Sequence, residues 1–148
     1  MPTETEADYR ARVDAALRVE LQRALGAELI DTADPAAGVR FPVRGLAATP
    51  AGTLHAGALN AIAELAGYLA VAPTLGPGEH AVTHAIATQV IRAAPRDAWV
   101  HVCSALSKRG RTLAFVTATA TLDAPGSTVI GTSQITKSIV ADRTDGAG

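Results

Sequence analysis

Residues 52–68 read G-T-L-H-A-G-A-L-N-A-I-A-E-L-A-G-Y, an apolar run of helical length. Apolar residues cover most of its circumference, which is the pattern of a helix that is buried on all sides. One carboxylate, Glu64, stands inside the run, and a buried glutamate is rare unless it is paired or functional. A narrow stripe with spacings of three and four holds the exceptions to the apolar pattern: Gly57, Asn60, Glu64 and Tyr68.

The segments on either side of this helix predict a sheet that is preceded by one more helix. Apolar residues recur at helical spacing from Ala7 to Leu25, and Gly26 ends this amphipathic helix. Two short strands are expected at Glu28–Asp31 and Val39–Val43. Four β-rich runs follow the central helix, at residues 81–92, 98–108, 112–122 and 129–140. This order predicts an α+β domain whose apolar helix lies against a curved antiparallel sheet.

Length and composition predict one domain and exclude several classes of protein. The 148 residues divide into the N-terminal helix at 7–26, a core at 27–140 and a polar tail at 141–148 that we expect to be disordered. A net charge of −1 gives no electrostatic case for nucleic-acid binding. The N-terminus is too acidic for a signal peptide, and no apolar run reaches the length of about 18 residues that a membrane span needs.

Cysteine and histidine usage excludes the common metal and disulfide frameworks. Cys103 is the single cysteine, so no disulfide can form within the chain, and a reducing cytoplasm is the expected compartment. The histidines show no metal-ligand spacing with any cysteine or acid. We therefore expect no metal and no bound cofactor.

Three motifs carry a resemblance to a known family. The first is T-L-H-A-G at 53–57, followed by an acid nine positions after His55, at Glu64. This resembles the His-Gly-Gly motif and acid of the PaaI-like branch of hot-dog acyl-CoA thioesterases. The runs A-V-T-H-A-I-A-T-Q-V-I-R-A-A at 81–94 and S-K-R-G-R-T-L-A-F-V at 107–116 resemble the family's third strand and Gly-Arg turn. Together the similarity covers residues 45–140, without the N-terminal helix.

The sequence departs from this family at three positions. Ala56 stands at the second position of the His-Gly-Gly motif, and Thr49 stands where relatives often have Asn or Gln. Tyr68 replaces a Thr that 4-hydroxybenzoyl-CoA-type relatives carry four positions after the acid. Having Glu rather than Asp at position 64 resembles that same 4-hydroxybenzoyl-CoA branch. The resemblance implies a hot-dog fold, in which a curved sheet wraps a long helix, and a homodimer or homotetramer with active sites at the dimer interface.

The first turn of the central helix and Glu64 supply the chemistry that a thioester needs. The backbone amides of Ala56 and Gly57 have no intrahelical partner, so they can serve as an oxyanion hole. Glu64 can attack the carbonyl to give an anhydride, or it can act as general base on water, and the sequence leaves both routes open. We interpret His55 as a residue of the substrate site that caps this helix or holds the loop before it, rather than as a base.

Further candidates come from the stripe, from the resemblance and from one basic turn. We expect Asn60 and Tyr68 to line the substrate site, with Asn60 able to hydrogen-bond Glu64, and the resemblance adds Thr49. The resemblance also brings Thr83 into the site from the partner subunit, although Thr is a common strand residue in any case. The basic turn, defined as Lys108, Arg109 and Arg111, is either a binding site for the CoA phosphates or a solvated hairpin turn.

These features predict hydrolysis of an acyl-CoA or acyl-carrier-protein thioester, with CoA present only as part of the substrate. The first alternative is a domain of the same fold that binds acyl-CoA or acyl carrier protein without catalysis, which Thr49 and Tyr68 leave open. The second is a hot-dog hydratase or dehydratase. That reading is less favoured, because such enzymes pair an Asp with a downstream His and no such pair occurs here.

Overall fold

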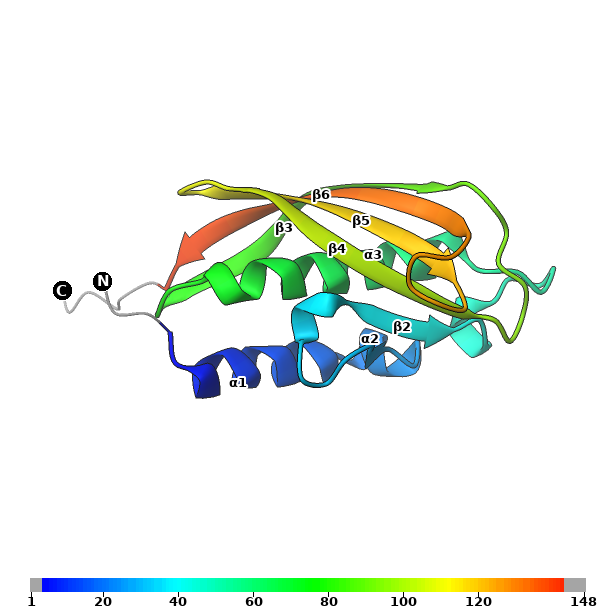
Figure 1. Ribbon diagram of the computed structural model, residues 1–148, viewed down its shortest axis with the longest axis horizontal. Coiled ribbons are helices and arrows are strands. Elements are labelled where there is room, and N and C mark those ends of the chain that lie inside the picture. The colour runs from blue at the N-terminus through cyan, green and yellow to red at the C-terminus, as the bar shows by residue number, and fades with distance from the viewer. Residues whose placement is uncertain (1–3, 143–148) are drawn as a thin grey trace.

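Helix α3, Ala56–Val71, is the centre around which the other elements are arranged (Figure 1). The computed structural model describes residues 4–142. In α3, the large side chains of Leu59, Ile62, Leu65 and Leu69 are buried, as its apolar pattern predicts. Within residues 4–142, one helical stretch is apolar and long enough to cross a membrane, Ala56–Thr74, and it contains this core helix.

Six antiparallel strands form one sheet that wraps α3, which confirms the predicted hot-dog fold (Figure 1). The spatial order is β1-β2-β4-β5-β6-β3. The strands are β1 Glu28–Leu29, β2 Val39–Pro42, β3 Glu79–Val90, β4 Trp99–Arg109, β5 Leu113–Leu122 and β6 Val129–Ala141. Short 3-10 turns lie at Pro35–Ala37, Gly45–Ala47 and Ala72–Thr74. Strands β1 and β3 are therefore the two edges of the sheet.

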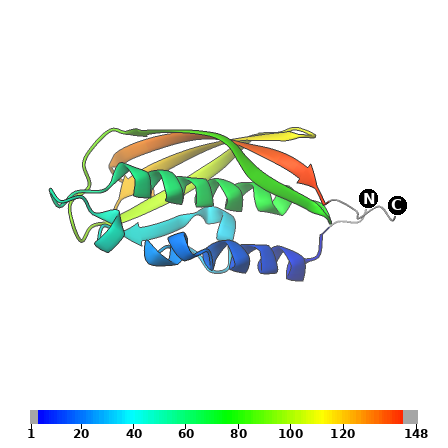
Figure 2. The ribbon, with the colours of Figure 1, turned by 180° about the vertical axis from the view of Figure 1, so that it is seen from behind.

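The N-terminal helices cover the side of α3 that faces away from strands β3 to β6 (Figures 1 and 2). Helix α1 spans Glu6–Leu17 and helix α2 spans Glu20–Ala24. Thr5 caps α1 in a capping box with Asp8. The buried side chains of Val13 and Leu25 join the core from this side. Helix α3 is thus enclosed between the sheet and the N-terminal helices.

The prediction of one unbroken helix from Ala7 to Leu25 is wrong, because the chain turns extended at Val19 (φ −54°, ψ 131°). The β-branched side chain of Val19 is slightly unfavourable in a helix. The break changes which residues face inward. Leu21 is one of the apolar residues that were expected to face the core from the predicted helix at 7–26, yet it is 50% exposed. The neighbouring Gln22 is 5% exposed. A polar amide is thereby buried beside the core.

A β-bulge in β3 changes which residues of that strand face α3. The pairing of β3 with β6 shifts between Thr83 and Ala85, so His84 is the extra residue. Thr83 hydrogen-bonds Glu64 on α3, and after the bulge Thr88 hydrogen-bonds Asn60 on the same helix. Because these two inward residues are an odd number of positions apart, the bulge is what lets both reach the helix.

The C-terminal boundary extends slightly beyond the predicted core. Ala141 is the last residue of β6, and the backbone amide of Asp142 donates to the carbonyl of Gly78. The remainder of the predicted tail, residues 143–148, lies outside the described part of the chain, as do residues 1–3.

Two glycines allow α3 to lie very close to β6. A Cβ atom added at Gly131 in β6 would lie 2.8 Å from Leu59 Cδ2 and 3.0 Å from the Gln89 carbonyl oxygen. A Cβ atom added at Gly67 in α3 would lie 3.0 Å from Ile135 Cδ1. A methyl group at either position would force its neighbours to move, so both glycines favour the close packing of helix and sheet.

We predict that Gly131→Ala lowers the free energy of unfolding by about 2 kcal/mol, because the added methyl overpacks the interface between α3 and β6. Urea denaturation of the purified protein measures this change. Gly76→Ala is the matched control, since a Cβ there meets no atom closer than 3.7 Å. Equal stabilities of the two variants would contradict the packing argument.

Candidate functional site

Glu64 is held by two donors from neighbouring strands of the sheet. Thr83 Oγ1 in β3 donates to Glu64 Oε1 at 2.8 Å, and Lys137 Nζ in β6 donates to the same oxygen. Lys137 Nζ also donates to Thr83 Oγ1 at 2.9 Å. Thr83 and Lys137 are directly paired residues of β3 and β6, so their side chains emerge side by side on one face of the sheet.

Lys137 is a fully buried lysine, and Glu64 is its counter-charge. The Lys137 side chain is 0% exposed, while the Glu64 side chain is 36% exposed. Burial lowers the pKa of Lys137 below its ordinary value, and the charge and hydrogen bond of Glu64 act in the opposite direction. The Tyr68 ring also contacts the cation, with its centroid 5.8 Å from Nζ.

A cavity of about 550 Å³ lies between α1, α2 and α3 and reaches Glu64. Helix α3 contributes Glu64, Leu65 and Tyr68 to its wall. The opposite wall consists mostly of small and apolar residues. The remaining lining residues are Ala11, Arg12, Ala15, Ala16, Val19, Gln22 and His80. Such a cavity has the size and mixed lining of a small-molecule site.

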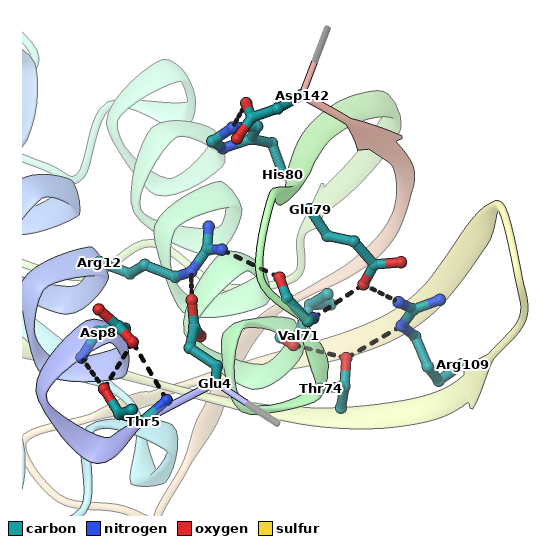
Figure 3. Close-up of polar contacts among 11 residues, drawn as sticks. Glu4, Thr5, Asp8, Arg12, Val71, Thr74, Glu79, His80, Arg109 and Asp142 are labelled. Carbon is teal, nitrogen blue, oxygen red and sulfur yellow. Dashed lines mark hydrogen bonds and ion pairs between the residues drawn. The ribbon is translucent and has the colours of Figure 1, made fainter. Parts of the chain in front are cut away.

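Two of the residues that line this cavity, Arg12 and His80, are paired with acidic side chains (Figure 3). Arg12 Nε lies 2.5 Å from Glu4 Oε1, and both side chains are largely buried. His80 Nε2 is hydrogen-bonded to Asp142 Oδ1. Gln22 lines the cavity as well, and no donor among residues 4–142 reaches its buried Oε1. The polar groups of the cavity therefore come from α1, α2, α3 and β3.

The start of α3 is arranged by His55, as predicted. His55 is the N-cap of the helix, and its Nδ1 accepts the backbone N–H of Gly57 at 2.9 Å. The Gly57 amide, a predicted oxyanion donor, is therefore engaged by the cap. The Ala56 amide has no hydrogen-bond acceptor among the described contacts, so it is the free donor of this first turn.

Two other predicted residues make contacts away from the Glu64 cavity. Asn60 accepts a hydrogen bond from Thr88 Oγ1 at 2.9 Å, which corrects the expected pairing with Glu64. Thr49 pairs with Thr53 across the loop before α3, with 3.0 Å between their hydroxyl oxygens. Neither residue lines the cavity beside Glu64.

The basic turn lies at the tip of the β4–β5 hairpin, and one of its three cations is occupied (Figure 3). Arg109 Nη2 lies 2.9 Å from Glu79 Oε2, and its Nε donates to Thr74 Oγ1 at 3.1 Å. Lys108 and Arg111 are exposed. Arg109 therefore ties the hairpin to the start of β3, and two cations face solvent.

Lys137 is the site residue that the motifs do not contain, although the sequence holds a signal for it. Ile135, Lys137 and Ile139 alternate along β6, and all three are buried. Period-two alternation therefore places the lysine on the inward face of its strand. Among the described residues, no group of three histidine, cysteine or acidic side chains is placed to hold a metal ion.

Comparisons with known proteins agree with this fold. Residues 51–128 match the sequence profile of the thioesterase superfamily. A thioesterase from Haemophilus influenzae is 21% identical with a TM-score of 0.76, covering 95% of this chain and 93% of that one. A Bacillus halodurans protein solved with CoA is 16% identical with a TM-score of 0.69, and the coverage is the same.

The PaaI protein of Escherichia coli, from the phenylacetic acid degradation operon, has the same fold. It is 17% identical with a TM-score of 0.68, covering 89% of this chain and 93% of that one. No curated protein sequence matches the chain significantly.

We predict that Glu64→Gln lowers the free energy of unfolding by roughly 3 kcal/mol, because it leaves the buried Lys137 cation without a counter-charge. The partial exposure of Glu64 places this value at the lower end of the range for broken buried pairs. The double variant Glu64→Gln/Lys137→Met removes both charges and should recover most of the loss. Urea denaturation at pH 7 compares the three proteins, and a double variant no more stable than the single one contradicts the pairing.

The same pair predicts a pH dependence. In Glu64→Gln, burial lowers the pKa of Lys137 and the opposing effect of Glu64 is absent. At pH values between this lowered pKa and about 10.5, the folded protein therefore binds fewer protons than the unfolded chain. Its unfolding free energy therefore rises with pH in this window. The stability gap to the wild type should narrow as the pH rises from 7 toward 10, and denaturation series at several pH values measure it.

Proposed function

Because the chain belongs to the thioesterase superfamily, we propose that it hydrolyses acyl-CoA thioesters with Glu64 as nucleophile or general base. The observation that carries this proposal is the setting of Glu64. It is the one carboxylate of an otherwise apolar helix, it is fixed by two donors, and it faces a cavity. A carboxylate held in place beside a small-molecule site is suited to either role.

CoA is the carrier that we infer, and the acyl group occupies the cavity beside Glu64. The Bacillus halodurans protein of the same fold was solved with CoA, which supports a CoA thioester as the substrate. The alanines of α1 leave the cavity open and largely apolar, which suits a hydrocarbon acyl group. The thioester carbonyl then lies at the Glu64 end of the cavity.

In one chain, the predicted oxyanion donor and Glu64 lie far apart for two groups that act on the same carbonyl. Glu64 follows Ala56 by two helical turns and more, so the two lie about 12 Å apart along α3. Both groups need to be within about 3 Å of the reacting carbonyl. We therefore infer that the site combines Glu64 of one chain with the Ala56 amide of a second copy, whose α3 runs antiparallel beside the first.

The free edge of the sheet supports this second copy. Strand β3 is twelve residues long and pairs on one side only, with β6. Val82 and Val90 on this edge are 49% and 43% exposed. A long open edge with exposed apolar residues needs a partner to avoid uncontrolled pairing. Pairing of β3 with β3 also brings the Glu64 region of one chain toward the other.

The proposal and the family resemblance differ in which residue the second subunit contributes to the site. The resemblance brings Thr83 of a partner subunit to the acid, whereas Thr83 of the same chain already donates to Glu64. The residue that a second copy contributes is then Ala56.

Complementation tests both the activity and the sharing. We predict that the wild type hydrolyses acyl-CoA, measured with a thiol-trapping reagent, and that Glu64→Gln/Lys137→Met and Ala56→Pro each lose at least about 99% of this activity, because an oxyanion donor is worth 10²–10³ in rate. Proline is well tolerated at the first helical position, and His55 already has the extended backbone that precedes proline, so Ala56→Pro removes little beyond the N–H.

When the two inactive proteins are unfolded and refolded together, hybrid dimers contain one intact site and activity should return. Glu64→Gln mixed with Thr83→Val should show no such gain, because those residues act in one chain. The opposite pattern contradicts the sharing through Ala56. A wild type that binds acyl-CoA without hydrolysing it contradicts the activity itself.

The exposed cations of the basic turn are proposed to bind the CoA phosphates. We predict that Lys108→Ala/Arg111→Ala raises KM for acyl-CoA about tenfold with little change in kcat, because the contact is made equally in ground and transition states. The same variant should hydrolyse an N-acetylcysteamine thioester, which lacks phosphates, at the wild-type rate. Equal losses on both substrates would overturn the assignment. Arg109 is left unchanged, since its ion pair with Glu79 holds the hairpin.

A further inference from the structure

We propose that Lys137 is the positioning residue of this site. It favours the ionised form of Glu64, and it anchors one oxygen of the carboxylate so that the other oxygen faces the thioester. The kinetic consequences of this inference rest on the proposed function. The ion pair between Lys137 and Glu64 is a property of the protein without substrate and can be tested separately. Lys137 itself is sealed from the cavity, with a side chain that is 0% exposed, so it acts through Glu64 and Thr83.

The direction of the hydrogen bonds carries the first step. An ammonium group can only donate, so the Thr83 hydroxyl oxygen accepts from Lys137. The single hydroxyl hydrogen of Thr83 is then committed to Glu64 Oε1. Lys137 therefore sets the orientation of Thr83 as well as contacting the carboxylate directly.

The choice of oxygen follows from this arrangement. Thr83 and Lys137 both donate to Glu64 Oε1, and no donor among residues 4–142 reaches Oε2. Oε1 is thus the anchored oxygen, and Oε2 is the oxygen that remains available. Because the Glu64 side chain is 36% exposed and lines the cavity, Oε2 is the atom that attacks the carbonyl or takes the proton from water.

The ionisation of Glu64 depends on one neighbour more than on the others. The other charged or titratable side chains around the cavity are Arg12 from α1, Tyr68 from α3 and His80 from β3. Arg12 is paired with Glu4, and His80 is paired with Asp142. Among the described residues, Lys137 is the one cation in ion-pair contact with the Glu64 carboxylate. Removing it makes the carboxylate harder to ionise in a partly buried setting.

The test replaces Lys137 by Met, which has a similar length and no charge, and by Gln, which keeps a donor without the charge. In both variants the acid limb of the kcat/KM profile should move to higher pH, because the carboxylate loses its neighbouring cation. Thr83→Val is the matched control for the lost hydrogen bond, and it should move the limb much less because no charge is removed.

An unmoved acid limb would overturn the proposal, because a purely structural lysine would lower the rate without changing the pH dependence. Carboxyl ¹³C NMR of Glu64 gives a readout that needs no substrate. Its titration midpoint should rise in Lys137→Met, and an unmoved midpoint would overturn the proposal even if the chain hydrolyses thioesters. A missing wild-type activity combined with a raised midpoint would instead refute only the proposed function.

The wild type supplies a readout in case neither variant folds. The chain has only two lysines, Lys108 and Lys137, so their ¹³Cε resonances are simple to assign. The Lys137 resonance should shift at the acid pH where Glu64 takes up its proton, and the resonance of Lys108, which is exposed, should not. A Lys137 resonance that stays still through that titration would contradict the coupling.

Discussion

The apolar character of α3 on nearly every face is the constraint on which the rest of the structure depends. A helix of this kind needs cover all round, and a single curved sheet covers only part of it. The N-terminal helices α1 and α2 cover another part (Figures 1 and 2). Glu64 lies at the boundary between the sheet and the N-terminal helices, with strand β3 on one side and the α1 wall of the cavity on the other. The polar site is therefore located where the sheet and the N-terminal helices meet around α3.

The buried Lys137 requires a negative charge at this boundary between the sheet and the N-terminal helices. A cation without solvent exposure is tolerated beside the core only because Glu64 compensates it. The same contact leaves one carboxylate oxygen anchored and the other available. Stability and the proposed chemistry therefore depend on one ion pair, so a substitution of Glu64 alone is expected to change folding as well as the proposed activity. The double variant with Lys137→Met separates the two effects.

Much of the fold could be predicted from the sequence because its signals are local. The apolar run around Glu64 predicts the central helix, and the nearly strict alternation in residues 112–122 together with the turns between strands predicts the succession of strands along the chain. The break at Val19 was missed because the apolar spacing continues across it, and only the backbone shows that Gln22 replaces Leu21 on the inner face.

The site was harder to predict, because several of its contacts join distant segments. Lys137 lies 73 positions from Glu64, and the pairing depends on the bulge and register of β3 and β6. The motif gave the capping role of His55 correctly. It could not indicate that this cap occupies the Gly57 amide, since that depends on the rotamer of one ring.

The close contact of α3 with β6 at Gly67 and Gly131 has a consequence for how the protein can diverge. The two glycines let α3 lie close to β6, and this close packing keeps Glu64 within reach of Lys137. The opposite wall of the cavity is built on α1, where Ala11 and Ala15 are exposed and pack against little. Substitutions there resize the cavity and leave the ion pair intact. Under the proposed function, the acyl group that is accepted can therefore change through substitutions in one short helix, while the position of Glu64 stays the same.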